Sequence, residues 1–485
     1  MKKEYYLNIA ENLKKELIEK KICLEGDGRI LNGGDEVIFD FKDHYVGYLT
    51  IDFSSVGHHQ DAPLYFSVQF AEIREELDAD TDDYRGWISK SWIQEEKIHI
   101  DVLPVSYKLE RRYAFRYVKI RIINTSDNYS VIVNRISART VSAADYSLVS
   151  YPVLPEKDRL LDKVSLKTLS SCMQEVFEDG PKRDRRLWLG DLRLEALTNY
   201  CTFRNYDLVR RCLYLFAGTD LEDGRVASNV FIYPRPEGDY QAMFDYSLFF
   251  ICVLWDYYEQ TGDLDTLKDL EPVCFRQYEL SEEAFAGNDV IDLNRTGRVF
   301  IDWNFDLDKT ASAQAVYIYV LRDLVKIEKE LNRDTGRIEE EINRKTAAAL
   351  KMFDTDRQLF VSGASSQVSY ASQVWMILAG VCDKDTGRLI LENIEKYEEA
   401  VRLNSPYAYH HYIQAMIDCG MHDEAYRKIH AYWGGMIQRG SDTFWEIYNP
   451  DDPDCSPYGG IVVHSFCHAW SCTPAYFLRK YYAGS

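Results

Sequence analysis

The spacing of hydrophobic residues changes once along this chain, close to Tyr151-Pro152, and no other feature constrains the fold as strongly. Between Val37 and Arg139, hydrophobic and polar residues alternate with the period of two that is typical of β-strands. After the change, hydrophobic residues recur at helical spacing almost to the C-terminus. Because 485 residues are too many for one ordinary core, we expect two domains, at 1–150 and 151–485.

The first part of the chain contains short segments with the composition of strands. They are residues 37–41, 48–53, 64–70, 96–103, 115–123 and 129–139. No strong helical pattern separates them, which favours an antiparallel β-sandwich. We expect residues 1–26 to form a short amphipathic helix before the sandwich, and the acidic residues 74–85 to form a loop.

The second part of the chain has roughly twelve helical segments in about 330 residues. They cover about 157–177, 192–217, 240–260, 264–284, 310–332, 338–352, 368–380, 387–402, 407–419, 422–436 and 462–481. The segments show no repeat at a fixed period, so a closed ring of helical hairpins, an (α/α)6 barrel, fits them better than a solenoid. Such a barrel places its longer linkers on one face.

Composition excludes several classes of function. The formal net charge is −21 and no Lys/Arg-rich stripe offsets it, which argues against nucleic acid or an anionic membrane surface as a partner. The eleven cysteines are odd in number and include no CxxC pair, so we expect free thiols in a reducing compartment. The N-terminus lacks the apolar run of a signal peptide and no stretch approaches a membrane span. We therefore expect a cytoplasmic protein, and the sequence makes no prediction about its oligomeric state.

Residues 177–192, FEDGPKRDRRLWLGDL, mix opposite charges around an aromatic ring. The segment contains Asp179, Asp184 and Asp191, four cations, and Trp188. A solvated loop would explain this composition. In a cleft, however, crowded carboxylates and guanidiniums tune one another's pKa, as general acid chemistry requires.

Four further linkers or helix ends are rich in polar and aromatic residues. They are residues 230–250 with Asp245, 300–308 with Asp302 and Trp303, 439–452 with Trp445 and Glu446, and 459–478 with His468. Hydrolysis of a glycosidic bond needs one protonated and one ionised carboxyl group, together with groups that hold the sugar ring. These segments contain that set of residues.

The chain resembles the inverting α-L-rhamnosidases of glycoside hydrolase family 78. The resemblance lies in DGPKRDRRLWLGDL (179–192), FIDWN (300–304), DTFWE (442–446) and SFCHAWS (465–471), and in the FRYVKI strand before the helical region. It implies an (α/α)6 barrel with an accessory β-sandwich. It also implies release of terminal α-L-rhamnose from glycosides, with inversion and without a cofactor or metal.

The resemblance also implies roles for individual residues. Asp184 resembles the proton donor and Glu446 the base that activates water. Asp179 and Asp191 resemble the aspartates that hold sugar hydroxyls, helped by Arg183. Further residues that resemble the lining of the rhamnose pocket are Asp302, Trp303, Trp445 and His468. We also expect Trp188 and Asp245 to bind the substrate, although Asp245 could instead cap a helix or lie at the surface. Many family members have a glutamate donor directly after an Arg-Asp pair, where this chain has Arg185. Counting back from Asp191 places Asp184 at the donor's position, and an arginine cannot give up a proton near neutral pH.

Other interpretations remain open at this point. The pocket could take another neutral deoxyhexose or a uronic acid, or the chain could bind sugar without catalysis. Asp302 could cap a helix and Trp303 could be a core residue. His464 and His468 have a spacing that metal sites use, but no third ligand pattern accompanies them, so we expect packed or sugar-contacting histidines. For an inverting enzyme we expect the two catalytic carboxyls about 6.5–9.5 Å apart.

Overall fold

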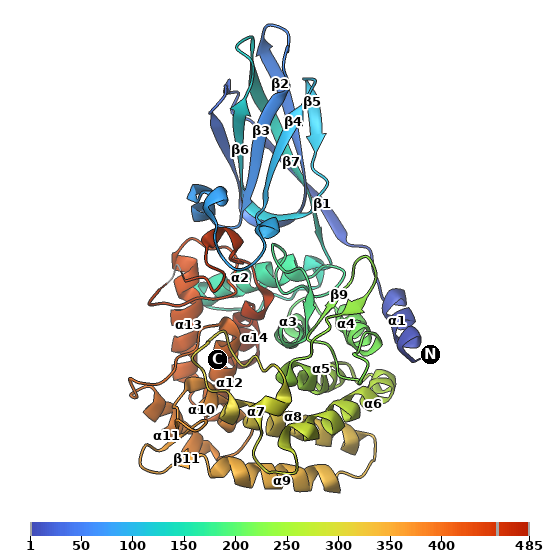
Figure 1. Cartoon of the computed structure of the whole chain (residues 1–485), viewed down its shortest axis with the longest axis vertical. Helices are drawn as coiled ribbons and strands as arrows, with labels where there is room; N and C mark the ends of the chain where they lie inside the picture. The colour runs from blue at the N-terminus through green and yellow to red at the C-terminus, as the bar shows by residue number, and fades with distance from the viewer. Residues whose placement is uncertain (1, 453–454, 484–485) are drawn as a thin grey trace.

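The computed structural model describes residues 2–452 and 455–483, and it places an elongated β module on a ring of helices (Figure 1). A short helix, α1 (Lys2–Asn12), precedes the module. Seven strands form one antiparallel sheet in the order β1-β7-β2-β6-β3-β4, with β5 paired to β2. The strands are β1 (Ile18–Glu25), β2 (Glu36–Gly57), β3 (Leu64–Ala71), β4 (Glu95–Ile100), β5 (Val105–Lys108), β6 (Tyr113–Asn124) and β7 (Tyr129–Ser142). This confirms the predicted antiparallel β architecture before the helices.

Two details of the β module differ from the sequence-based prediction. The predicted strands 37–41 and 48–53 are one strand, β2, whose pairing with β6 shifts register between Asp40 and Tyr45. The predicted helix 1–26 is wrong beyond Asn12, because β1 follows. Strand β1 is largely exposed and pairs along its length with β7, so backbone hydrogen bonds hold it in place, while Ile22 and Leu24 pack on the hydrophobic core of the module. The acidic residues 74–85 contain two short 3-10 helices, Arg74–Asp78 and Thr81–Asp83.

The helices form two concentric sets. The inner set is α3 (Leu189–Cys201), α5 (Phe244–Thr261), α8 (Thr310–Glu330), α10 (Tyr370–Leu378), α12 (Pro406–Asp418) and α14 (Pro474–Phe477). The outer set is α2 (Glu156–Cys172), α4 (Tyr206–Gly218), α6 (Leu264–Ser281), α9 (Gly336–Leu350), α11 (Lys384–Ile394) and α13 (His422–Gln438). Inner helices pack on their inner neighbours, and each outer helix packs on an inner one. Helix α5 is apolar on nearly all sides, as burial within the ring requires, whereas α9 and α11 keep a polar outer face.

The linkers of the ring have two lengths. The linkers that lead from an outer helix to an inner one are long: 173–188, 219–243, 282–309, 351–369, 395–405 and 439–473. The linkers that return outward are short: 202–205, 262–263, 331–335, 379–383 and 419–421. Because the helices alternate in direction, all long linkers lie at one end of the ring, as the sequence predicted.

Two predicted helices are corrected. The predicted helix 192–217 is two helices, because the chain turns after Cys201 and the Asn205 side chain caps α4 by accepting a hydrogen bond from Leu208 N. The predicted helix 462–481 is also wrong. Its first half is irregular chain with two short 3-10 helices, Ile461–Val463 and Ala469–Ser471. Here His468 N donates to Phe444 O (2.9 Å) and Ala469 N to Asp179 O (2.8 Å).

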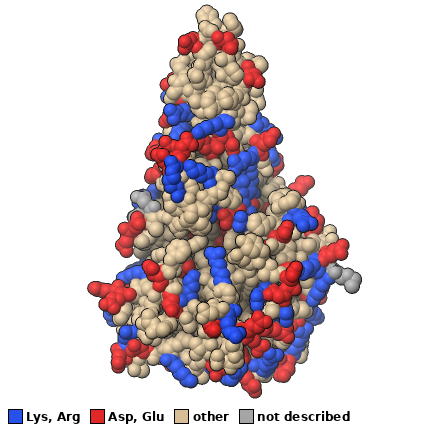
Figure 2. Space-filling model, viewed as in Figure 1, with Lys and Arg blue, Asp and Glu red and all other residues tan. Residues whose placement is uncertain are grey.

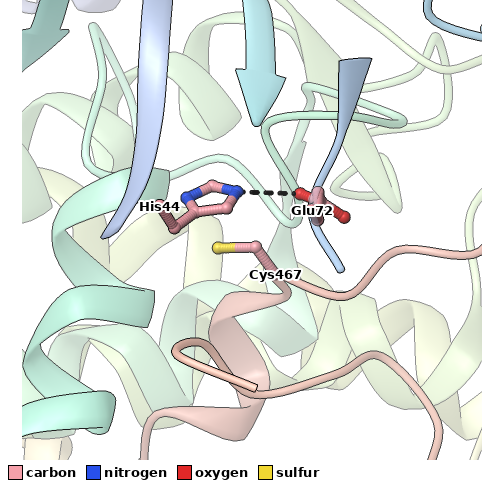
Figure 3. Close-up of side chains that lie close together, drawn as sticks. All are labelled: His44, Glu72 and Cys467. Atoms are coloured by element: carbon pink, nitrogen blue, oxygen red, sulfur yellow. Dashed lines mark hydrogen bonds and ion pairs between the residues drawn. The ribbon is translucent and has the colours of Figure 1, made fainter. Parts of the chain in front are cut away.

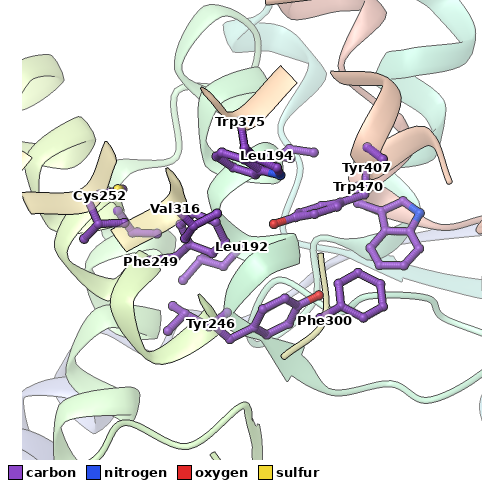
Figure 4. Close-up of a cluster of buried hydrophobic side chains, with 14 of the residues drawn as sticks. Leu192, Leu194, Tyr246, Phe249, Cys252, Phe300, Val316, Trp375, Tyr407 and Trp470 are labelled. Carbon is purple, nitrogen blue, oxygen red and sulfur yellow. The ribbon is translucent and has the colours of Figure 1, made fainter. Parts of the chain in front are cut away.

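Aromatic side chains fill the centre of the ring (Figure 4). Tyr246 lies 5.6 Å from Phe300, and Phe300 lies 5.8 Å from Trp470. Tyr407 packs against the rings of Phe300 and Trp470, and Trp375 lies in the same cluster. This aromatic cluster packs beneath the long linkers.

Buried polar contacts join the β module to that end of the ring. His44 Nε2 lies 3.1 Å from Glu72 Oε1 beside the thiol of Cys467 (Figure 3). The other Glu72 oxygen accepts a hydrogen bond from Phe466 N (2.7 Å). These groups are fully buried, so this part of the contact between the two modules is closed to bulk solvent.

Acidic and basic side chains are interspersed over the face shown in Figure 2, where no long basic stripe is seen. Within residues 2–452 and 455–483, no helix has the length and apolar character needed to cross a membrane.

Candidate active site

A cavity opens among four of the long linkers. Its lining residues are Asp179, Arg183, Asp184, Trp188, Asp191, Met243, Tyr246, Arg298, Phe300, Trp303, Glu446, Tyr458, His468 and Trp470. Its volume is about 60 Å³.

Larger cavities lie elsewhere in the molecule, among them three of about 440, 490 and 850 Å³. In the 440 Å³ cavity Arg193 is paired with Asp256, and in the 850 Å³ cavity Arg112 is paired with Glu178. None of these three cavities combines carboxyls and neutral histidine with a tryptophan. We therefore consider the smaller cavity the chemically significant one.

The loop that follows Asp179 folds back on its carboxylate. The two carboxylate oxygens accept hydrogen bonds from Asp184 N (3.2 Å) and Arg186 N (3.0 Å), and Arg185 N donates to Gly180 O (3.1 Å). A Cβ at Gly180 would lie 2.5 Å from Arg183 O, so only glycine fits this turn. The loop therefore directs Arg183 and Asp184 toward the cavity.

Arg183 joins both predicted catalytic carboxyls. Its Nη2 donates to Glu446 Oε2, and its Nη1 lies 3.3 Å from Asp184 Oδ1. Its Nε donates to Val463 O (3.1 Å), which fixes the plane of the guanidinium. Two carboxyls more than 250 residues apart in sequence thus face one cavity.

Glu446 is buried and held on several sides. Its Oε1 accepts a hydrogen bond from the Tyr458 hydroxyl. Its backbone N donates to Ser465 O (3.0 Å), and its carbonyl accepts from Trp470 Nε1 (2.9 Å). Burial raises the pKa of Glu446, whereas the Arg183 charge and the Tyr458 hydrogen bond lower it.

His468 lies between two aspartates. Its Nε2 is 3.7 Å from Asp179 Oδ2, and its Nδ1 is 3.6 Å from Asp191 Oδ1. Burial lowers the pKa of His468 well below its ordinary value, so the ring is neutral. Burial, and then the neighbouring Asp184 carboxyl, raise the pKa of Asp179 to about 8, and burial raises that of Asp191 well above its ordinary range.

Asp191 Oδ1 and His468 Nδ1 are buried, and within the described part of the chain neither has a hydrogen-bond partner. Unpaired buried polar atoms are costly. They are suited to binding sugar hydroxyls, which donate and accept hydrogen bonds.

Tryptophans form two walls of the cavity. Trp188 meets Tyr246 edge-on at 6.2 Å, and Trp303 meets Tyr458 edge-on at 5.9 Å. Such faces suit the C–H surface of a sugar ring. The sequence interpretation missed Tyr458 and Arg298; neither lies in a motif that resembles the family, and no local pattern marks them.

Three of the predicted pocket residues lie behind the cavity wall. The Asp245 carboxylate accepts hydrogen bonds from Phe300 N (3.0 Å) and Ile301 N (2.9 Å), so it holds a linker in place. The Trp445 indole is buried in the core, where its Nε1 donates to Ser441 Oγ (2.7 Å).

Asp302 is the third of these residues. It is buried, and its oxygens accept hydrogen bonds from Trp303 N, Asn404 N and both donors of Ser405. Burial raises the pKa of Asp302 to about 6, against the effect of these donors.

Among the described residues, one group has the composition of a metal site: His44, Glu72 and Cys467, whose ligand atoms lie within 4.8 Å of one another. The hydrogen bonds of this group account for its burial without an ion, because His44 Nδ1 also contacts Ser171 Oγ (3.0 Å). His464 and His468 do not share a helix face, since their segment is irregular.

The fold and the site together define a glycoside hydrolase of the six-hairpin class, with an accessory β module. Comparison with protein families makes the assignment specific. Residues 15–140 match the glycosyl hydrolase family 78 α-rhamnosidase N-terminal domain, and residues 158–482 match the bacterial α-L-rhamnosidase six-hairpin glycosidase domain. The chain belongs to the α-L-rhamnosidases of glycoside hydrolase family 78.

Solved structures agree with this assignment. A rhamnosidase from Klebsiella oxytoca with rhamnose bound is 41% identical, with a TM-score of 0.94 over 99% of this chain and 98% of that one. The family 78 rhamnosidase of Bacillus sp. GL1 is 19% identical, with a TM-score of 0.77, and shares the fold. The matched region covers 94% of this chain and 47% of the Bacillus protein. A comparison with curated proteins gave no match.

Proposed function

We propose that this chain hydrolyses terminal α-L-rhamnosides with inversion, using Asp184 as the proton donor and Glu446 as the base. The observation that carries the proposal is the contact of one guanidinium, that of Arg183, with both carboxyls at one cavity. The rhamnose-bound Klebsiella oxytoca structure, 41% identical over nearly the whole chain, supports rhamnose as the sugar.

The exposure of the two carboxyls supports their separate roles. The Asp184 side chain is 21% exposed and that of Glu446 is 4% exposed. A donor must reach the leaving oxygen, whose aglycone extends to solvent, whereas the base acts on a water held beneath the sugar. This difference in exposure supports Asp184 as the donor.

The remaining polar groups fit a role in holding the sugar. Asp179 and Asp191 flank the neutral His468, so the three offer both donors and acceptors to ring hydroxyls. Trp188 and Trp303 line the same cavity and offer aromatic faces to the ring. Hydrogen bonds and aromatic faces of this kind are sufficient for a neutral sugar without a cofactor.

The test is turnover of an aryl α-L-rhamnoside, with the configuration of the first product followed by NMR. We expect the released sugar to have the inverted configuration. Glu446→Gln and Asp184→Asn should each lower kcat by about 10³-fold or more, with the fold unchanged. Glu398→Gln and Asp356→Asn, at exposed positions, are the matched controls. Retained configuration, or a rate within tenfold of wild type in either site variant, would refute the assignment.

We also propose a reducing, cytoplasmic location. It is supported by the eleven cysteines, all of them free, of which Cys23 and Cys455 are exposed. Cell fractionation of the producing organism, with a thiol titration of the recovered protein, tests this proposal; recovery outside the cytoplasm would overturn it.

A further inference from the structure

The β module and the helical ring build a small hydrophobic core next to the cavity. Its buried members are Tyr84, Tyr458, Val462 and Val463. The partly buried residues packed on it include Ile88 and Trp92 from the β module and Trp303 from the ring. Because Trp303 and Tyr458 also line the cavity, the β module borders the active site itself.

This contact is made at the backbone of one turn of the ring. The Tyr84 hydroxyl donates to Tyr458 O (2.8 Å), and Trp87 Nε1 donates to Pro457 O (2.7 Å). A Cβ at Gly86 would lie 1.9 Å from Tyr458 O, so the two segments approach this closely only because residue 86 is glycine. Two directed hydrogen bonds and a glycine contact therefore fix the turn.

The side chain of the same turn reaches Glu446. The Tyr458 hydroxyl donates to Glu446 Oε1, and the Arg183 guanidinium lies 3.8 Å from the centre of the Tyr458 ring. Tyr458 is buried, so neither contact competes with bulk water. Tyr458 therefore contacts the β module through its backbone carbonyl and the Glu446 carboxylate through its hydroxyl.

We propose that the 84–87 segment of the β module positions the catalytic base. By holding the turn at Tyr458, it keeps the tyrosine hydroxyl on Glu446, which fixes the carboxylate and favours its ionised form. Tyr84, Gly86, Trp87 and Tyr458 are positioning residues. The inference rests on the proposed role of Glu446, and it makes the β module part of the catalytic apparatus.

A change in pH dependence follows from this role. The charged and titratable groups that face Glu446 are Arg183, Asp184, Asp191 and Tyr458. The Tyr458 hydrogen bond lowers the pKa of Glu446. When that bond is lost the pKa rises, so the acidic limb of the kcat/KM profile moves to higher pH.

The experiment uses the full chain with the double substitution Tyr84→Phe/Trp87→Phe, and Tyr458→Phe alone. Trp87 is 67% exposed, so the double variant removes two hydrogen bonds with little loss of packing. Tyr129→Phe is the matched control, since its hydroxyl also donates to a carbonyl of the β module, Ala62 O (2.9 Å). Activity on an aryl α-L-rhamnoside is measured from pH 4 to 9, with thermal unfolding followed in parallel.

We expect the double variant to lower kcat by about tenfold, with a smaller change in KM and an upward shift of the acidic limb. Tyr458→Phe should give the same shift and a larger loss, whereas Tyr129→Phe should match wild type. The inference would be overturned if the double variant kept the wild-type kcat and the wild-type position of the acidic limb. It would also be overturned if kcat fell while the acidic limb of the kcat/KM profile did not move. If Glu446→Gln is itself fully active, the proposed function has failed; if it is inactive and the double variant is normal, only this inference has failed.

Discussion

Replacing Asp302 with alanine tests what holds one wall of the cavity. The buried carboxylate accepts hydrogen bonds from Trp303 N (2.8 Å) and Asn404 N (2.8 Å). It also accepts from Ser405 N (3.1 Å) and Ser405 Oγ (2.5 Å). Ser405 caps the N-terminus of α12, so one carboxylate ties the linker that carries Trp303 to an inner helix.

The expected loss of stability follows from these four bonds. A hydrogen bond to a charged acceptor contributes about 1.5–3 kcal/mol, and a buried donor left unpaired costs about 1–3 kcal/mol. Water can enter the space left by the side chain of Asp302 and satisfy some of the donors, so we expect Asp302→Ala to cost about 3–5 kcal/mol. With an unfolding entropy of about 2.1 cal/mol/K per residue over the helical ring, this corresponds to a fall in Tm of about 4–7 °C.

The assay is thermal unfolding followed by circular dichroism, with KM and kcat measured on the same preparations. Asp383→Ala is the control, because Asp383 also caps a helix, α11, but does so in an exposed position; that change should cost about 1 kcal/mol. An unchanged Tm for Asp302→Ala together with a large increase in KM would refute this reasoning. It would instead support Asp302 as a direct ligand of the sugar.

Two further changes separate structural from catalytic roles. Trp445→Phe should lower stability by about 2–3 kcal/mol without raising KM, because the indole lies in the core; a raised KM at unchanged Tm would contradict its placement. Although burial alone lowers the pKa of His44, Cys467 and Glu72 raise it to about 9. The pKa of a histidine in the unfolded chain is about 6.5. The ion pair of charged His44 with Glu72 therefore contributes its full stability below pH 6.5, and this contribution is lost as the pH rises through 9. The Tm difference between wild type and His44→Gln should therefore shrink from pH 6 to pH 9.5; a difference that grows would contradict a charged His44.

Much of the candidate site could be predicted because its residues lie in short, chemically distinctive segments. Asp179 and Asp184 lie in one linker and Asp191 lies in the first turn of the helix that follows it, and the structure places all three at the cavity with Glu446. Residue type alone could not separate these from Asp245, which also lies near the start of an inner helix. That carboxylate is turned to backbone N–H groups instead of the cavity, and the direction depends on how the neighbouring linker packs.

Tyr458 shows why other parts of the site were missed. It lies in an irregular turn, twelve residues after Glu446, and no periodicity or motif marks it. Its role comes from two contacts distant in sequence, Tyr84 of the β module and Arg183 of the first linker. Such contacts exist only once both modules have folded against each other.

The sequence by itself determined the order of the two architectures, because hydrophobic periodicity is a local property of the chain. It also located the charged segment 179–192. The tertiary structure alone decided that residues 18–25 form an edge strand and that 462–473 run as irregular chain, because backbone hydrogen bonds to distant segments outweigh local propensity there. It likewise decided which carboxyls face the cavity, since a side chain's direction is set by the packing around it.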